Sequence, residues 1–325
     1  MTEPLLEVTD LSVEYATQAA DVRAVDRVSF IVEPHEFLGI VGESGCGKST
    51  LLFAVSRLLS PPGEVVGGRV IFRGEDMVRL GSESLRHMRW RDFSIVMQSA
   101  MNALNPMKTV GAQFRDTMEG HGKATDAEIR HRSEEVLEMV GIDRVHLGSY
   151  PHQLSGGMRQ RAMIAMALLF APQLVMMDEP TSALDVVAQR SLMTKIKDLQ
   201  KELGFAVIFV THDMSVVSRF SDRVMVMYAG QVAEADRTAA IFARPLHPYT
   251  RGLMAAFPSV VGPRRELTGI PGAPPDLARP PSGCRFNPRC PDVMPACLTH
   301  EPELYSVGDA EVRCLLYAQQ PKEAV

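Results

Sequence analysis

The sequence lacks a hydrophobic run long enough to cross a bilayer. Its longest apolar stretch, residues 162–177, is interrupted by Pro172 and Gln173 and falls short of the roughly 20 residues that a membrane helix needs. The first ten residues contain neither a basic segment nor a long apolar segment, so they do not resemble a secretory signal. We therefore expect a cytoplasmic protein without a membrane span of its own.

The chain also has no excess of positive charge. Its 34 Lys and Arg residues stand against 39 Asp and Glu residues, which gives a formal net charge of -5. Such a chain has no overall attraction to the phosphate backbone of nucleic acids, so we expect no nucleic-acid partner. With 325 residues and 46% hydrophobic composition, the chain is long enough for one large core and a smaller appendage.

Short apolar runs predict the strands of an α/β fold. Runs at 37–41 and 69–72 are bounded by Gly and Pro, as strands are. Those at 174–178, 206–210 and 224–228 are continuously apolar rather than alternating. Such strands are typical of a parallel sheet that is covered on both faces.

Two other stretches interrupt this pattern. A helical insertion is expected from about 99 to 170, where Thr125 and Glu128 have the spacing of a helix capping box. After Arg244 the sequence becomes rich in Pro and then in Cys, which predicts a linker followed by a small tail. We therefore expect a main domain over 1–244 and an extension over 245–325.

The segment GESGCGKST follows the predicted strand at 37–41 and opens a helix, which is the context that a P-loop requires. Its glycines allow backbone N–H groups to surround phosphates, Lys48 reaches the terminal phosphates, and Ser49 supplies a ligand to Mg²⁺. Cys46 is assigned to this loop rather than to a metal. The predicted nucleotide-binding residues are Gly42, Ser44, Gly45, Cys46, Gly47, Lys48, Ser49 and Thr50.

Two consecutive acids end the strand at 174–178. Asp178 is expected to hold Mg²⁺ through a water molecule, and Glu179 is expected to polarise the water that attacks ATP. The P-loop and this acidic pair together predict an ATPase.

The segment LSGGMRQR at 154–161 resembles the signature sequence of ABC-type ATPases. Ser155 can cap the helix that begins near Met158, and Gly156 and Gly157 expose backbone N–H groups at its positive end. In the ABC family this segment binds the phosphates of the ATP that is held by the opposite subunit. The resemblance therefore implies a P-loop NTPase fold of the ABC type and a head-to-tail pair of ATPase subunits.

Other positions match ABC family elements in the expected order. Tyr15 resembles the aromatic residue that stacks on adenine, and Gln98 resembles the Q-loop glutamine, which in this family also contacts Mg²⁺. The segment SALD at 182–185 resembles the D-loop, with Asp185 in the nucleotide site, and His212 resembles the switch histidine that contacts the γ-phosphate.

Two further segments are similar to the ATP-binding proteins of oligopeptide and dipeptide importers. They are QSAMNALNP at 98–106 and HPYTR at 247–251. The resemblance implies a subunit on the cytoplasmic face of the inner membrane, which couples ATP hydrolysis to peptide import through two separate permease subunits. It also implies an external substrate-binding protein and a second ATPase, more often a different chain than a second copy. The permease docks after Gln98 in this family.

Alternatives to peptide import remain at this stage. Nickel importers share the architecture, and a soluble ABC ATPase of translation or DNA repair is a further alternative. Soluble translation-type members usually carry two cassettes and repair members a long coiled coil, whereas this chain has one P-loop and no heptad run.

Four cysteines gather in the tail: Cys284, Cys290, Cys297 and Cys314. Four thiolates suit either Zn²⁺ or a [4Fe-4S] cluster, and unligated thiols or disulfides are the remaining alternative. The spacings match no common zinc CxxC pair, and the resemblance to the peptide-importer tail favours the iron-sulfur cluster. His247 is expected to be a solvated surface residue rather than a ligand.

Overall fold

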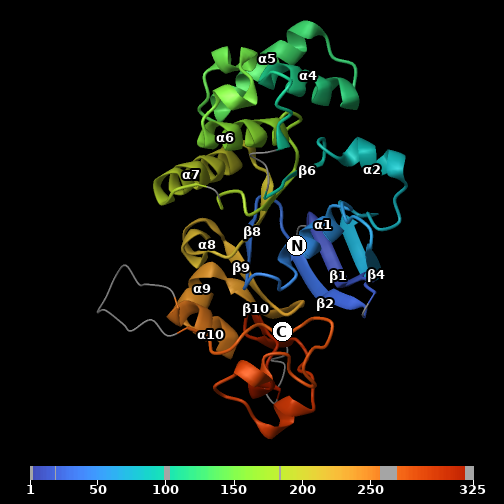
Figure 1. Cartoon of the computed structure of the whole chain (residues 1–325), viewed down its shortest axis with the longest axis vertical. Coiled ribbons are helices and arrows are strands. Elements are labelled where there is room, and N and C mark those ends of the chain that lie inside the picture. The colour runs from blue at the N-terminus through green and yellow to red at the C-terminus, as the bar shows by residue number, and fades with distance from the viewer. Residues whose placement is uncertain (1–2, 19, 99–102, 183, 257–268, 319–325) are drawn as a thin grey trace. The chain divides into compact units, whose positions relative to one another are not determined.

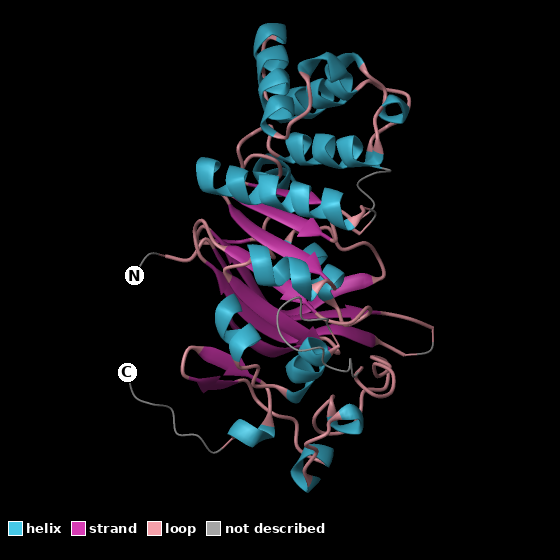
Figure 2. Cartoon of the chain, turned by 90° about the vertical axis from the view of Figure 1, so that its left-hand side faces the viewer, coloured by secondary structure: helices cyan, strands magenta, loops and turns pink. Residues whose placement is uncertain are grey.

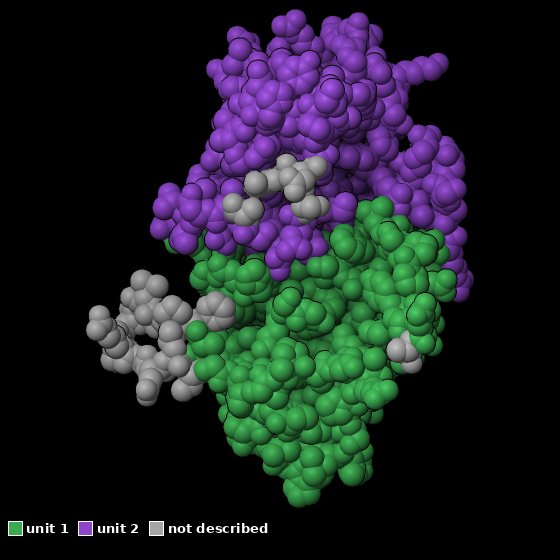
Figure 3. Space-filling model, viewed as in Figure 1, with its two compact units in different colours: residues 1–32, 37–78, 210–325 green, residues 33–36, 79–209 purple. Residues whose placement is uncertain are grey.

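The structure is a computed structural model that describes residues 3–18, 20–98, 103–182, 184–256 and 269–318 (Figure 1). The chain divides into two compact units, shown in different colours in Figure 3. Unit 1 comprises residues 1–32, 37–78 and 210–325, and unit 2 comprises residues 33–36 and 79–209. Each unit is therefore assembled from segments that are far apart in the sequence.

The first group of strands in unit 1 is an antiparallel sheet in the order β2-β1-β4-β5. It consists of β1 (Leu6–Tyr15), β2 (Val22–Val32), β4 (Gly63–Phe72) and β5 (Glu75–Asp76). In the β1–β2 register Leu6 lies opposite Val32 and Tyr15 lies opposite Val22. Alternate side chains of β1 are buried at its start, as expected for a sheet with one covered face.

The second group of strands in unit 1 follows the order β11-β12-β10-β9-β3. It consists of β3 (Phe37–Val41), β9 (Arg223–Tyr228), β10 (Gln231–Arg237), β11 (Tyr305–Val307) and β12 (Ala310–Val312). Strands β3 and β9 are parallel, and every residue of β3 is buried. The antiparallel pairing of β12 with β10 makes the tail part of this unit.

The helices of unit 1 connect these strands. They are α1 (Lys48–Val55), α8 (Met214–Phe220), α9 (Thr238–Ala243) and α10 (Pro248–Ala255). Short 3-10 turns are η3 (Asn287–Arg289), η4 (Pro295–Leu298) and η5 (Leu315–Tyr317).

Unit 2 contains strands in the order β8-β7-β6, with β6 and β7 parallel. These are β6 (Phe93–Val96), β7 (Leu174–Asp178) and β8 (Ala206–Thr211), of which residues 206–209 lie in this unit. Its helices are α2 (Ser82–Met88), α4 (Val110–His121), α5 (Asp126–Met139), α6 (Gly156–Ala167) and α7 (Val186–Leu203). Its 3-10 turns are η1 (Arg144–Gly148) and η2 (Pro151–Gln153).

Helices α4, α5 and α6 form the helical part of unit 2, and Figure 2 shows them as helices joined by loops. They lie within the stretch 99–170 that was expected to be helical, of which residues 99–102 lie outside the described residues. The capping box of Thr125 and Glu128 at the start of α5 is confirmed. The five predicted strands are also confirmed, as β3, β4, β7, β8 and β9.

Two expectations for the tail were wrong. The segment after Arg244 is not simply a linker, because Pro248 occupies the first turn of α10, where its missing N–H costs nothing. His247 is not solvated but 3% exposed, and its ring accepts a hydrogen bond from the Tyr249 N–H at the start of this helix. The boundary at 244/245 stays a prediction.

Candidate functional site

The P-loop lies in unit 1 between the end of β3 and the start of α1. Gly47 precedes α1 with φ 100°, and a Cβ added to it would lie 2.2 Å from the Ala24 carbonyl oxygen. Gly42 has a similarly close neighbour, since an added Cβ would lie 2.2 Å from the Met227 carbonyl oxygen. Only glycine fits these two positions without displacing backbone. The loop is therefore held in one shape by its surroundings.

Lys48 is 5% exposed and points back into the loop that precedes it. Its ammonium group donates hydrogen bonds to the carbonyls of Gly42, at 2.8 Å, and Glu43, at 2.9 Å. Cys46 is buried beside Lys48, and burial raises the pKa of the Cys46 thiol. This cysteine belongs to the wall of the P-loop, as the sequence suggested.

Tyr15 ends β1 on the same unit and lies close to α1. Its hydroxyl is 3.4 Å from the Thr50 hydroxyl, and its ring lies against Gly63, where an added Cβ would be 2.6 Å from a ring carbon. Tyr15 is only partly buried. The structure thus brings Tyr15 to the P-loop helix, with a part of the ring accessible.

The acidic pair and the Q-loop glutamine lie together in unit 2. Asp178 is the last residue of β7 and is 2% exposed. Gln98 follows the parallel neighbour β6, and its side-chain amide donates a 2.8 Å hydrogen bond to the Glu179 carboxylate. Since parallel strands end at the same edge of a sheet, the pairing of β6 with β7 explains why these two side chains meet. Glu179 has φ 44°, a left-handed conformation that is uncommon for a non-glycine residue.

The signature segment forms the start of α6. Ser155 is the residue before the helix, and its hydroxyl accepts a 3.2 Å hydrogen bond from the Met158 N–H. The helix begins at Gly156, two residues earlier than expected. Apart from the chain neighbours and the helix's own backbone, no atom of the described residues lies within 4 Å of a Cβ built on Gly157. This helix end is therefore open on that side. Such an end, with free N–H groups and a positive dipole, is suited to bind an anion.

The D-loop connects the acidic pair to α7. The Ser182 hydroxyl donates to the Glu179 carbonyl at 3.1 Å, and the Asp185 carboxylate accepts from the N–H groups of Val187 and Ala188. Asp185 therefore caps α7, which sequence reasoning did not anticipate. Ala183 lies outside the described residues.

His212 directly follows β8 and is exposed. The next residue, Asp213, caps α8 by accepting a 2.8 Å hydrogen bond from the Ser215 N–H. The predicted site residues thus come from both units: Tyr15, the P-loop and His212 from unit 1, and Gln98, Asp178, Glu179, Asp185 and the signature from unit 2.

The four tail cysteines are free and lie in one part of unit 1. The Cys284 N–H donates to the Cys297 carbonyl at 2.9 Å. Burial raises the pKa of Cys314 to about 11, and the three other thiols contribute to the increase.

No group of three or more His, Cys, Asp or Glu side chains within the described ranges is arranged to hold a metal ion. A tetrahedral zinc site with Zn–S bonds of about 2.3 Å would require sulfur atoms about 4 Å apart. Thiolates are the donors that bind iron-sulfur clusters, but the described cysteine side chains do not form a group that could hold a metal ion.

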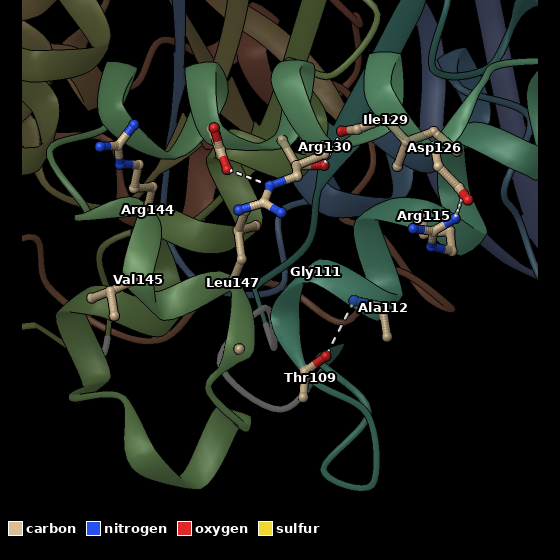
Figure 4. A pocket seen from close by; sticks show the side chains of 13 residues that line it. Thr109, Gly111, Ala112, Arg115, Asp126, Ile129, Arg130, Arg144, Val145 and Leu147 are labelled. Carbon is tan, nitrogen blue, oxygen red and sulfur yellow. Dashed lines mark hydrogen bonds and ion pairs between the residues drawn. The ribbon is translucent and has the colours of Figure 1, made fainter.

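A hollow of about 690 Å³ lies in the helical part of unit 2 (Figure 4). It is lined by α4, α5 and η1, with Arg115 paired to Asp126 and Arg130 paired to Glu134. Val145 on η1 is 70% exposed beside it. This hollow contains none of the predicted nucleotide-binding residues.

Sequence reasoning missed the residues that hold the P-loop from outside. Tyr249 on α10 and Arg289 in the tail both bind Glu43, the second residue of the loop. The segment HPYTR drew attention to the first of these. No sequence signal pairs Glu43 with an arginine 246 positions later.

The chain contains a P-loop, a Q-loop glutamine, a serine-capped signature helix and a strand that ends at an acidic pair. Together these elements define an ATPase of the ABC class. Residues 25–182 match the ABC transporter family, and residues 233–297 match the family described as the C-terminal region of oligopeptide/dipeptide transporters. The chain belongs to the ATP-binding proteins of oligopeptide/dipeptide ABC transporters.

Individual relatives are similar in sequence over nearly the whole chain. The chain is 41% identical to the dipeptide transport ATP-binding protein DppD of Caldanaerobacter subterraneus, over 97% of this chain and 98% of that protein. It is 43% identical to the oligopeptide transport ATP-binding protein OppD of Salmonella typhimurium, over 94% and 91%. Among solved structures, a dimeric ATP-binding cassette bound to ADP and Pi is similar with a TM-score of 0.65 and 28% identity, covering 72% of this chain and 98% of that chain.

Proposed function

We propose that the chain is the ATP-hydrolysing subunit of an importer for dipeptides or oligopeptides. Two observations support this: membership of the peptide-transporter family, and the contact of Gln98 with Glu179 beside the buried Asp178. Glu179 accepts a hydrogen bond from Gln98 and lies next to Asp178. A carboxylate oriented in this way is suited to orient and polarise a water molecule.

Each predicted residue has a role in this proposal. Lys48 would neutralise the terminal phosphates of ATP, and Ser49, Gln98 and, through water, Asp178 would hold the Mg²⁺ that stabilises the phosphate charge. Glu179 polarises the attacking water, and His212 contacts the γ-phosphate. Tyr15 stacks on the adenine, which is supported by its position beside Thr50 and by its partly accessible ring.

A second ATPase subunit completes the site. The open helix end at Gly157 and the capping by Ser155 support a role for the signature in binding the phosphates of ATP on another chain. We propose a head-to-tail pair, in which the partner is a different ATPase chain rather than a second copy. The similar cassette bound to ADP and Pi is described as dimeric.

Membrane subunits complete the transporter. Among the described residues, no helix combines the length and the apolar character that a membrane crossing requires. We propose that two permeases carry the peptide, that an external protein delivers it, and that this chain binds to the cytoplasmic face of the permeases. The helical part of unit 2, with Val145 and the 82% exposed Met107, is the proposed docking region.

We also propose that Cys284, Cys290, Cys297 and Cys314 hold a [4Fe-4S] cluster with a structural role. Their number and the thiol donor chemistry support it. When bound, the cluster would cross-link four points of the tail. Anaerobic purification followed by iron and sulfide analysis tests this, with about four of each expected per chain and a loss in Cys290→Ser.

The principal experiment compares Glu179→Gln with Lys48→Ala in ATP binding and in phosphate release. Glu179→Gln removes only the water-polarising carboxylate, so it should bind ATP like the wild type and hydrolyse it at least 100-fold more slowly. Lys48→Ala should instead weaken ATP binding itself. Turnover near the wild-type rate in Glu179→Gln would contradict the assignment.

A further inference from the structure

The loop between two of the tail cysteines, CRFNPRC at 284–290, contacts the P-loop region through its two arginines. We call these seven residues the arginine loop. Arg285 directly follows Cys284, and Arg289 directly precedes Cys290. Both arginines lie in unit 1, as does the P-loop.

Arg289 makes a bidentate ion pair with the P-loop residue Glu43. Its two terminal nitrogens lie 2.6 Å and 2.9 Å from the two Glu43 carboxylate oxygens. Arg289 is 6% exposed, and its remaining nitrogen donates to the Pro271 carbonyl at 2.8 Å. Because Arg289 is buried and hydrogen-bonded on both sides, its ion pair holds Glu43 more rigidly than a solvent-exposed ion pair would.

The backbone of Glu43 is held from the same side. The buried Tyr249 hydroxyl accepts the Glu43 N–H at 2.9 Å. Tyr249 packs on Tyr228 and on Phe286, the aromatic residue of the arginine loop, with ring centroids 4.5 Å and 5.5 Å away. The side chain and the amide of Glu43 therefore both depend on the tail.

Arg285 supports the other end of the P-loop indirectly. It donates to the Ala229 carbonyl and lies 2.5 Å from an oxygen of the buried Asp26. The adjacent residue Gly230 donates its N–H to the Cys46 carbonyl at 2.9 Å. The arginine loop thus contacts Glu43 directly and is connected to Cys46 through Ala229 and Gly230.

These contacts bear directly on the nucleotide-binding lysine. The Lys48 ammonium group donates to the Glu43 carbonyl, so a displacement of Glu43 changes the surroundings of Lys48. We propose that Arg289 is a positioning residue for ATP, which holds the P-loop in its binding conformation through Glu43. The tail then influences nucleotide affinity, because Arg289 belongs to it. This inference rests on the proposed ATPase function.

The test measures ATP affinity and steady-state hydrolysis for Arg289→Ala in the full chain. The matched control is Arg251→Ala, which removes an arginine of the same region whose ion pair with Asp292 is on the surface. We expect Arg289→Ala to weaken ATP binding at least tenfold and to raise KM for ATP with less than a threefold loss of kcat. We expect Arg251→Ala to change ATP affinity less than twofold, and Arg289→Lys to restore part of the loss.

A double-mutant cycle separates positioning from simple support of the fold. Glu43→Ala should weaken ATP binding to a similar degree, and the Glu43→Ala/Arg289→Ala double variant should bind no more weakly than either single variant. A lower melting temperature of Arg289→Ala with an unchanged Kd for ATP would overturn the inference, and so would additive losses. If Arg289→Ala does not fold, the same comparison of Kd is made with Arg289→Gln and Glu43→Gln.

Different ATP-binding results would refute the positioning role and the proposed function. A wild-type chain that does not bind ATP would refute the proposed function. A wild-type chain that binds ATP, with Arg289 variants that bind it equally well, would refute only the positioning role.

Discussion

Two P-loop glycines differ in the space around them, and this difference gives a quantitative prediction. Gly45 and Gly47 both have positive φ, of 79° and 100°. Around Gly45, no atom of the described residues other than its chain neighbours lies within 4 Å of an added Cβ, whereas at Gly47 the Ala24 carbonyl oxygen would be 2.2 Å away. Alanine in a left-handed conformation costs about 1–2 kcal/mol. Gly45→Ala should therefore lose this amount of stability and no more.

Gly47→Ala should lose more, because the neighbouring atom belongs to the backbone of β2 and cannot rotate away. Overpacking of this kind costs about 1–3 kcal/mol in addition. In a unit of about 150–250 residues, 1 kcal/mol corresponds to roughly 2–4 °C in Tm. For a difference of about 2 kcal/mol we therefore expect Gly47→Ala to melt about 4–8 °C below Gly45→Ala.

The assay is calorimetric melting without nucleotide, so that contacts of the new methyl group with ATP do not contribute. The wild type and Gly45→Ala serve as the two references. Equal losses of Tm in the two variants would refute the argument that the Ala24 carbonyl confines the end of the P-loop.

Three further predictions concern other parts of the molecule. Ser155→Ala removes the helix cap of α6 and should lower stability by about 0.5–2 kcal/mol, measured by urea unfolding; no change would contradict the capping role. Gln98→Ala removes the hydrogen bond to Glu179 and should slow phosphate release more than it weakens ATP binding, and the reverse pattern would contradict the assignment. Burial lowers the pKa of His247 from 6.5 to about 3. Between these two pH values His247 is protonated in the unfolded chain but not in the folded chain, so the free energy of unfolding falls as the pH drops below about 6.5. His247→Asn keeps an acceptor for the Tyr249 N–H but does not titrate, so its free energy of unfolding should fall less between pH 6.5 and 5; an identical decline would show that other groups cause it.

Much of the core was predictable because its signals are local. The continuous apolar runs at 174–178 and 206–210 became buried strands, and the capping box of Thr125 and Glu128 opens α5 as expected. The order of the motifs identified Gln98, but the strand before it, β6, was not predicted. The pairing of β6 with β7 brings Gln98 to Glu179.

The contacts of the tail were not predictable, because they join positions that are far apart in the sequence. The prolines after Arg244 were interpreted as a linker, although Pro248 starts a helix when a preceding side chain caps it. The sequence around His247 predicts a solvated residue. Its burial depends on packing against Phe286 in the arginine loop, which is far away in the sequence. The ion pair between Glu43 and Arg289 depends on the same packing.

The central claim is that this chain works as the ATPase of a peptide importer. The most direct test is to purify the tagged chain from detergent-solubilised membranes of its host and to identify the associated proteins by mass spectrometry. The account predicts two permease subunits and a second ATPase, together with ATP hydrolysis by the purified complex. Recovery of the chain with soluble partners alone, and without any membrane protein, would contradict it.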